Sequence, residues 1–178
     1  DPTGDCLYIG TATSPGKVIK VRLSDFSRLG ALGLSPGENI LWGAAADPSG
    51  EYAYFSTRTS PTRIVKVRLS DLTRTGALTL NPGEDLAGGA IVIDAKGEKL
   101  YCGTQTSPGI VVQVQLSDFS RAQAMTLFTG EDRTVDMAID PAGQYADAAL
   151  ATTPGKLAKV RMSDFTKVGT LTLDAAVP

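Results

Sequence analysis

Short runs of apolar residues, partly alternating with polar ones, are separated by turn-forming residues along the whole chain. Segments 17–23 (KVIKVRL) and 63–69 (RIVKVRL) are rich in β-branched residues, and segments 52–55 (YAYF) and 77–80 (ALTL) are shorter runs of the same kind. Such runs are typical of β-strands. Because the turn residues recur too often to leave room for helical repeats, the pattern predicts an all-β chain.

The turns between these runs are of recognisable kinds. Asp47-Pro48-Ser49-Gly50 has Pro in the second position and Gly in the fourth, which predicts a type I turn. Ser14-Pro15-Gly16-Lys17 places Gly third, where a type II turn requires a positive φ, so we expect a type II turn there. The pair Ser24-Asp25 supplies side-chain oxygens that can bond the neighbouring backbone.

Three phrases recur in step along the chain. The phrase related to Asp-Pro-x-Gly starts at Asp1, Asp47, Asp94 and Asp140, which gives spacings of 46, 47 and 46 residues. The phrases that begin at Thr13 and Leu23 also occur four times each, with the same spacings. We therefore divide one domain, residues 1–178, into repeats 1–46, 47–93, 94–139 and 140–178, the last of them incomplete. Each full repeat is expected to contain four strands, beginning with an inner run before the Asp-Pro turn.

A repeat of about 40–50 residues with four short antiparallel strands has the size of a β-propeller blade. The turn followed by a Tyr strand, as in Tyr8-Ile9-Gly10-Thr11 and Tyr101-Cys102-Gly103-Thr104, resembles the propeller superfamily with YVTN and NHL repeats. This resemblance covers almost the whole chain and implies a β-propeller of four-stranded antiparallel blades. It implies no single function, because propellers carry many activities.

The phase of the repeats predicts about three and three-quarter blades. The chain starts just after the innermost strand of its first blade, and residues 174–178 stand where the next innermost strand would begin. An incomplete ring exposes sheet edges, which soluble proteins avoid. Three arrangements remain open. Two chains complete one ring, the chain is a segment of a longer repeat protein, or four blades close on themselves.

Composition and charge exclude several classes of partner and of catalytic site. Seventeen Lys and Arg against nineteen Asp and Glu give a net charge of −2, so we expect no nucleic-acid partner. No apolar stretch approaches the ~18 residues of a spanning helix, so we expect no membrane insertion. The chain contains no His, which excludes His-based catalytic triads and His-containing zinc sites. Cys6 and Cys102 occupy non-equivalent positions two repeats apart, so we expect free thiols, with an inter-chain bond from Cys6 as the alternative.

An acidic loop recurs before each inner strand, on the same expected face as the Thr-Ser-Pro turns. Carboxylates and hydroxyls gathered in this way suit calcium, a sugar or a basic partner. The alternative is that these side chains cap the loop and recur because the blade recurs. The candidate ligand-binding residues of this loop are Glu38, Glu84, Asp85, Glu131 and Asp132.

Departures from the repeat give a second candidate site. Asp136 replaces a small residue on the expected inner strand, Arg133 stands three residues before it, and Trp42 is the only Trp. In a central channel these three residues could hold a small polar ligand, or they are ordinary polar pairing and packing residues. One extra residue near Gly88-Gly89 predicts a bulge.

The preferred hypothesis is a non-enzymatic, secreted or cell-surface propeller that acts as a structural, self-assembling or protein-binding scaffold. Its open blade edges would bind a protein partner or copies of the same chain, and no cofactor is expected apart from calcium. One alternative is a metal-dependent hydrolase, because propellers resembling this one include sugar lactonases that hold a metal through Glu, Asn and Asp. No set of residues here matches that motif residue by residue. A lectin-like propeller, supported by Trp42 and the hydroxyl-rich loops, is the other alternative.

Overall fold

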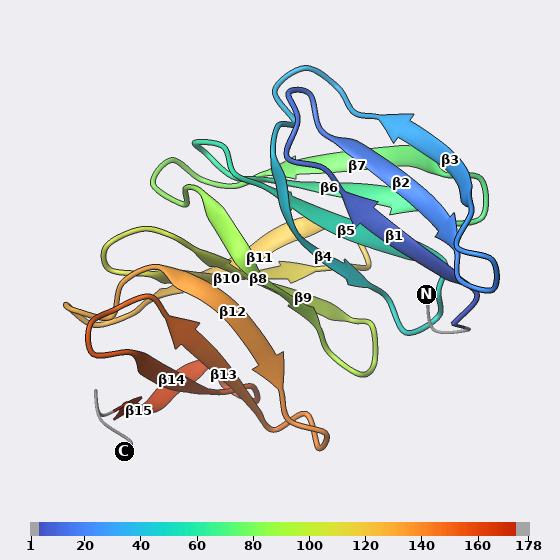
Figure 1. The fold of residues 1–178 in the computed structure, drawn as a ribbon. Coiled ribbons are helices and arrows are strands. Elements are labelled where there is room, and N and C mark those ends of the chain that lie inside the picture. Colours follow the sequence, from blue (N-terminus) through green and yellow to red (C-terminus); the bar gives the residue numbers. More distant parts are fainter. Residues whose placement is uncertain (1–3, 174–178) are drawn as a thin grey trace, which may run out of the picture.

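The computed structural model describes residues 4–173, which form four antiparallel sheets arranged in an arc (Figure 1). The first sheet contains β1 (Cys6–Gly10), β2 (Lys17–Arg22) and β3 (Arg28–Gly33). The second contains β4 (Leu41–Ala46), β5 (Tyr52–Thr57), β6 (Arg63–Arg68) and β7 (Thr73–Thr79). The third contains β8 (Ala87–Ile93), β9 (Lys99–Thr104), β10 (Ile110–Gln115) and β11 (Ser120–Thr126). The fourth contains β12 (Thr134–Ile139), β13 (Tyr145–Leu150), β14 (Lys156–Arg161) and β15 (Thr166–Thr172).

Every sheet is a meander in which each strand pairs with the next one along the chain. The first strands of the second, third and fourth sheets are innermost, and β8 lies between β4 and β12 and packs against both (Figure 1). This arrangement confirms the predicted all-β propeller with four-stranded antiparallel blades. The first blade is the exception, because β1 corresponds to β5, β9 and β13 and has no inner strand beside it in the described residues.

Glycines allow the inner strands to approach one another closely. A Cβ on Gly43 would lie 2.8 Å from Cγ2 of Ile91, and one on Gly88 would lie 2.6 Å from the carbonyl oxygen of Thr134. The predicted bulge near Gly88 is confirmed, because the pairing of β8 with β9 shifts register between Ala87 and Ile91. At the hub of the propeller these glycines therefore let the backbone of one inner strand approach the side chains or backbone of the next.

Two of the three predicted turns are confirmed, and the third prediction is wrong. The Gly50 amide donates to the Asp47 carbonyl at 3.0 Å, as the predicted Asp-Pro turn requires, and the Ser27 amide donates to Asp25 Oδ1. The predicted type II turn is wrong, because Ser14-Pro15 is a cis peptide and Gly16 has no positive φ. Gly16 instead meets the next blade, where an added Cβ would lie 2.8 Å from Cγ of Leu41.

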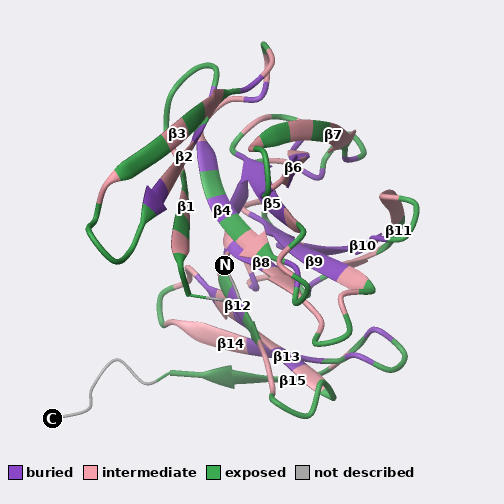
Figure 2. Cartoon of the chain, turned by 90° about the vertical axis from the view of Figure 1, so that its right-hand side faces the viewer, coloured by how far each residue is buried: buried purple, intermediate pink, exposed green. Residues whose placement is uncertain are grey.

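Three apolar clusters hold the blades together, one at each interface between successive sheets. Figure 2 shows the central strands β5 and β9 largely buried, whereas β3 and β15 at the two ends of the arc are largely exposed. The ring centroids of Tyr54 and Phe119 lie 5.7 Å apart across the second interface, and those of Tyr101 and Phe165 lie 5.7 Å apart across the third. Blade stability therefore depends on each blade having a neighbour.

Two further expectations concern single features of the chain. Within residues 4–173 no disulfide joins Cys6 to Cys102, and Cys102 is buried in the second interface. No helix that could span a membrane occurs within residues 4–173.

Candidate functional site

The recurrent glutamates lie in ion pairs within single blades. Glu84, in the loop before β8, binds Arg121 on β11, and the shortest distance is 2.5 Å between Oε1 and Nη2. Glu38 binds Arg74 on β7 at the same distance, and Glu131 binds Lys167 on β15. In each case the loop that enters a blade is thereby fastened to the outermost strand of that blade.

The same glutamates also cap their own loops. Glu84 Oε2 accepts a hydrogen bond from the Asn81 amide at 2.8 Å, and Glu131 Oε2 accepts one from the Phe128 amide. Burial acts to raise the pKa of Glu131, but hydrogen bonds from Lys167, Thr170 and the Phe128 amide outweigh it, so that the pKa is lowered. These carboxylates are occupied by protein donors, which favours the scaffold interpretation of the acidic loops.

The neighbouring aspartates do not complete a metal site. Asp132 Oδ1 accepts a hydrogen bond from Ser107 Oγ at 2.8 Å, and Asp85 Oδ1 is buried without a hydrogen-bond partner. In the described part of the chain, no three Asp, Glu or Cys side chains come together to hold a metal ion. The acidic loops therefore supply separate carboxylates and no common calcium cage.

The three residues that depart from the repeat have separate partners. Trp42 on β4 is half exposed, and Cζ of Arg58 lies over its ring, 5.1 Å from the ring centroid. Arg133 Nη2 donates to the Ala151 carbonyl, and Asp136 Oδ1 accepts from the Met137 amide. Strand β8 lies between Trp42 on β4 and Asp136 on β12, and no hydrogen bond or ring contact joins Trp42 to either polar residue within residues 4–173.

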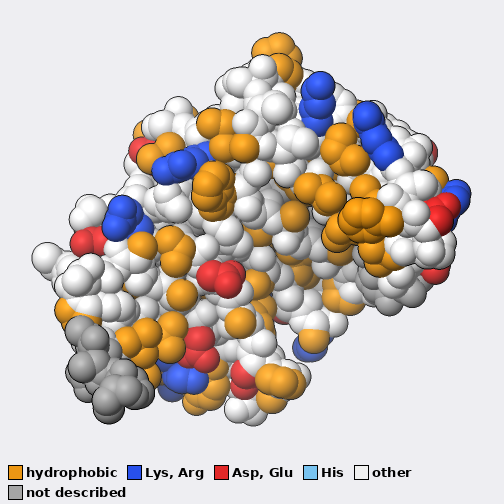
Figure 3. Space-filling model, viewed as in Figure 1, with side chains coloured by type: hydrophobic (Ala, Val, Ile, Leu, Met, Phe, Trp, Pro, Cys, Tyr) orange, Lys and Arg blue, Asp and Glu red, His pale blue; other side chains and the backbone are white. Residues whose placement is uncertain are grey.

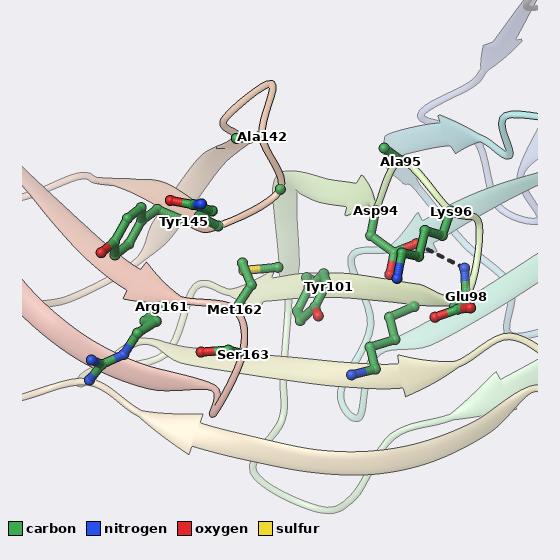
Figure 4. Close-up of a pocket in the computed structure, with 13 residues that line it drawn as sticks. Asp94, Ala95, Lys96, Glu98, Tyr101, Ala142, Tyr145, Arg161, Met162 and Ser163 are labelled. Atoms are coloured by element: carbon green, nitrogen blue, oxygen red, sulfur yellow. Dashed lines mark hydrogen bonds between the residues drawn. The ribbon is translucent and has the colours of Figure 1, made fainter.

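A cleft of about 510 Å³ lies between the third and fourth blades on the side of the Asp-x-x-Gly turns (Figure 4). Pro48 of the second blade packs 3.2 Å from the Cβ position of Gly97 in the third blade. Ala95 takes the place of Pro48 one blade later, and the Cβ position of Gly143 has no neighbour within 4 Å. The space beside Gly143 is therefore unfilled, whereas Pro48 fills the equivalent space beside Gly97.

The side chains around this cleft serve the fold. Asp94 Oδ1 accepts from the Glu98 amide at 2.8 Å within the turn, as the dashed line in Figure 4 marks. Tyr101 is buried against Phe165, and its hydroxyl accepts a hydrogen bond from Gln113 Nε2 at 3.1 Å. Burial raises the pKa of Tyr101, which keeps the phenol neutral. The cleft is a concave surface lined by both acidic and basic side chains. None of the residues described in this paragraph is an activated nucleophile.

The end surfaces of the arc contain residues that the sequence analysis did not single out. We define the leading face as the side of the first blade that points away from the second blade, with Leu7, Ile9, Leu23 and Phe26 exposed by 41%, 42%, 44% and 77%. Figure 3 shows hydrophobic side chains gathered over β1 and β2. At the equivalent positions of the second blade, Ala53, Phe55 and Leu69 are at most 3% exposed, because the first blade covers them.

We define the trailing face as the opposite side of the fourth blade, with Leu171 exposed by 60% and Leu173 by 45%. The residues equivalent to Leu173 in the preceding blades, Leu80 and Leu127, are each 3% exposed because the following blade covers them. The repeat alignment could have identified both faces, since the residues of these faces are uncovered copies of positions that are buried in the inner blades.

Comparison with known proteins supports the fold alone. No family model and no curated protein matches the sequence. The structure is similar to the WD40 repeats of RRP9, with a TM-score of 0.76 and 11% identity, and to U3-55K, with a TM-score of 0.75 and 11% identity. Both matches cover 94% of this chain and 48% of the other, so the chain spans about half the length of these structures. The β-propeller is thus supported, and the narrower YVTN or NHL type is not confirmed.

Proposed function

We propose that this chain is a non-enzymatic, protein-binding propeller scaffold that assembles with a second copy of itself through its leading and trailing faces. The propeller fold, shared with WD40 repeat structures, is consistent with a protein-binding role. Location outside the cell or at its surface remains part of the proposal, and fractionation of the source cells would test it.

The observation that carries the proposal is the exposure of both halves of one repeated interface. In the described structure, three interfaces join the trailing side of one blade to the leading side of the next. Phe119 and Phe165 each pack against a Tyr of the preceding blade, whereas the equivalent Phe26 is 77% exposed. Leu173 is the uncovered counterpart of Leu127 on the other side. A head-to-tail contact between two copies would bury both surfaces by the geometry that the molecule already uses three times.

Burial of these side chains supplies the driving force. A fully buried Leu or Phe contributes about 1.5–3 kcal/mol relative to an exposed one. Exposed apolar surface of this kind typically marks an interaction site. Two such contacts related by rotation would close a ring, whereas a rotation that does not close would give an open filament.

Light scattering after size exclusion tests this assembly. We expect the wild-type chain to have a mass of at least twice 18.6 kDa at high concentration, and Phe26→Asp to shift the protein to the monomer. Phe128→Asp is the matched control, because Phe128 is 66% exposed but lies on neither face. A wild-type monomer over a roughly hundredfold concentration range would overturn the self-assembly. Hydrolysis of a lactone or ester by the purified chain would overturn the non-enzymatic role.

A further inference from the structure

We propose that the first blade binds an extended polypeptide segment as its missing innermost strand, and that Arg28 binds a Glu three residues before that strand. This inference rests on the proposed protein-binding role and names the chemistry of one partner. The partner is a segment with Glu, two loop residues and then a strand of small and apolar residues.

The other three blades show what occupies the equivalent position. Strands β4, β8 and β12 pair antiparallel with β5, β9 and β13, respectively. Each inner strand begins three residues after its glutamate, at Leu41, Ala87 and Thr134. In the described residues β1 pairs only with β2, so its other edge presents backbone groups of the kind that accept an added strand.

Arg28 is the first-blade copy of the basic residue of the recurrent ion pair, and no carboxylate pairs with it in the described residues. It stands 46 residues before Arg74 and occupies the same position on β3 that Arg74 occupies on β7. Arg74 Nε and Nη2 both donate to Glu38. Arg28 is exposed and makes no side-chain hydrogen bond or ion pair in residues 4–173. Its guanidinium is therefore available to a carboxylate, which it can bind in bidentate fashion.

A backbone donor at the same edge supports this register. The amides of Arg58, Gln105 and Ala151 each donate to the carbonyl of the residue just before an inner strand. The equivalent amide, that of Ala12, donates to no backbone carbonyl in the described structure. An incoming segment whose Glu reaches Arg28 would bring a carbonyl to Ala12 by the same repeat geometry.

A second copy of this chain does not supply this Glu in register. Val177 stands 46 residues after Glu131 and takes its position in the repeat. Residues 174–178 of a second copy therefore do not supply the carboxylate. The proposed segment can bind whether or not the trailing face of another copy covers the leading face.

A synthetic peptide with the sequence of residues 81–94 provides the probe, because it contains Glu84 and the whole of β8. Fluorescence anisotropy of the labelled peptide measures its affinity for the full chain. We expect saturable binding, weakened about tenfold by Glu84→Gln in the peptide or by Arg28→Gln in the protein. Lys96→Gln is the matched control, because it removes another exposed positive charge from a different blade. A charge exchange, Arg28→Glu with a Glu84→Arg peptide, should restore part of the affinity.

Hydrogen exchange locates the bound peptide. We expect the amides of β1 and Ala12 to gain protection and those of the outer strand β7 to remain unchanged. The absence of saturable binding would overturn this inference, and so would an affinity that Arg28→Gln leaves unchanged. These results are independent of the mass measurement, so self-assembly without peptide binding would leave the proposed function standing and remove only the strand site.

Discussion

Glu84 Oε1 lies 2.5 Å from Nη2 of Arg121, and this contact fastens the loop before β8 to the outermost strand of the same blade. The Glu84 side chain is only 6% exposed, and it accepts a backbone hydrogen bond from Asn81 as well. The pair recurs as Glu38 with Arg74 and as Glu131 with Lys167. An acidic motif that first suggested a ligand site is thus part of the blade architecture.

Loss of the Glu84 carboxylate should destabilise the fold. Glu84→Gln leaves the Arg121 guanidinium without its counter-ion in a largely buried setting, and we expect a loss of about 2 kcal/mol in the free energy of unfolding. Urea titration followed by circular dichroism measures this loss. Asp71→Asn is the control, because the Arg68–Asp71 pair is exposed and should contribute less. Equal effects of the two substitutions would contradict the structural role of Glu84.

Stability should fall in acid over a defined range. The hydrogen bond from Arg68 lowers the pKa of Asp71 from 3.8 to about 2, and the pKa of Glu131 is also lowered. A carboxylate with a lowered folded-state pKa stabilises the fold above its ordinary pKa, and the contribution is lost as the pH falls through the folded-state value. We expect urea midpoints to be constant from pH 7 to about 5 and to fall between about 4.5 and 2.

The Glu131→Gln variant isolates one contribution to this acid dependence. Its urea midpoint should be lower than that of the wild type at pH 7, and the difference should shrink as the pH falls. A difference between the two proteins that does not change with pH would show that Glu131 is not ionised in the fold.

The two thiols should differ in reactivity. Burial raises the pKa of Cys102 to about 12, whereas Cys6 is partly exposed. Because the thiolate is the reactive form, DTNB should leave Cys102 unmodified in the folded protein and modify both cysteines in guanidinium. In the Cys6→Ser variant Cys102 is the remaining cysteine, so any DTNB reaction of that variant belongs to Cys102. Rapid reaction of the folded Cys6→Ser protein would show that the second interface opens.

Refilling the cleft between the third and fourth blades should stabilise the protein. Ala95→Pro restores the residue that Pro48 provides one blade earlier, at a turn position suited to proline. We expect a gain of about 0.4–1 kcal/mol from reduced freedom of the unfolded chain. Thermal unfolding measures this gain, and Pro48→Ala should produce the opposite shift. A lower melting temperature for Ala95→Pro would mean that the two turns differ in conformation.

The sequence predicted the elements whose causes are local or repeated. The Asp-Pro-x-Gly turns, the order of strands in a blade and the bulge near Gly88 all follow from residue types at fixed offsets. The turn at Ser14-Pro15 was wrong because Gly16 meets Leu41 of the next blade, and such a contact between distant residues has no local signal. The partner of Glu84 was missed for the same reason, since Arg121 lies 37 residues away. Phe26 looks like any core aromatic in the sequence, and only the structure shows that nothing in the described chain covers it.

Cross-linking between two single-cysteine variants tests the head-to-tail assembly most directly. Asp147 occupies the position at which Tyr54 and Tyr101 meet Phe119 and Phe165, so Phe26 of one copy should meet Asp147 of another. In a Cys6→Ser background, a short bismaleimide should join Phe26→Cys to Asp147→Cys when the two proteins are mixed. Each variant alone should remain uncross-linked. Cross-linking of Phe26→Cys to itself, or no product in the mixture, would contradict the assembly.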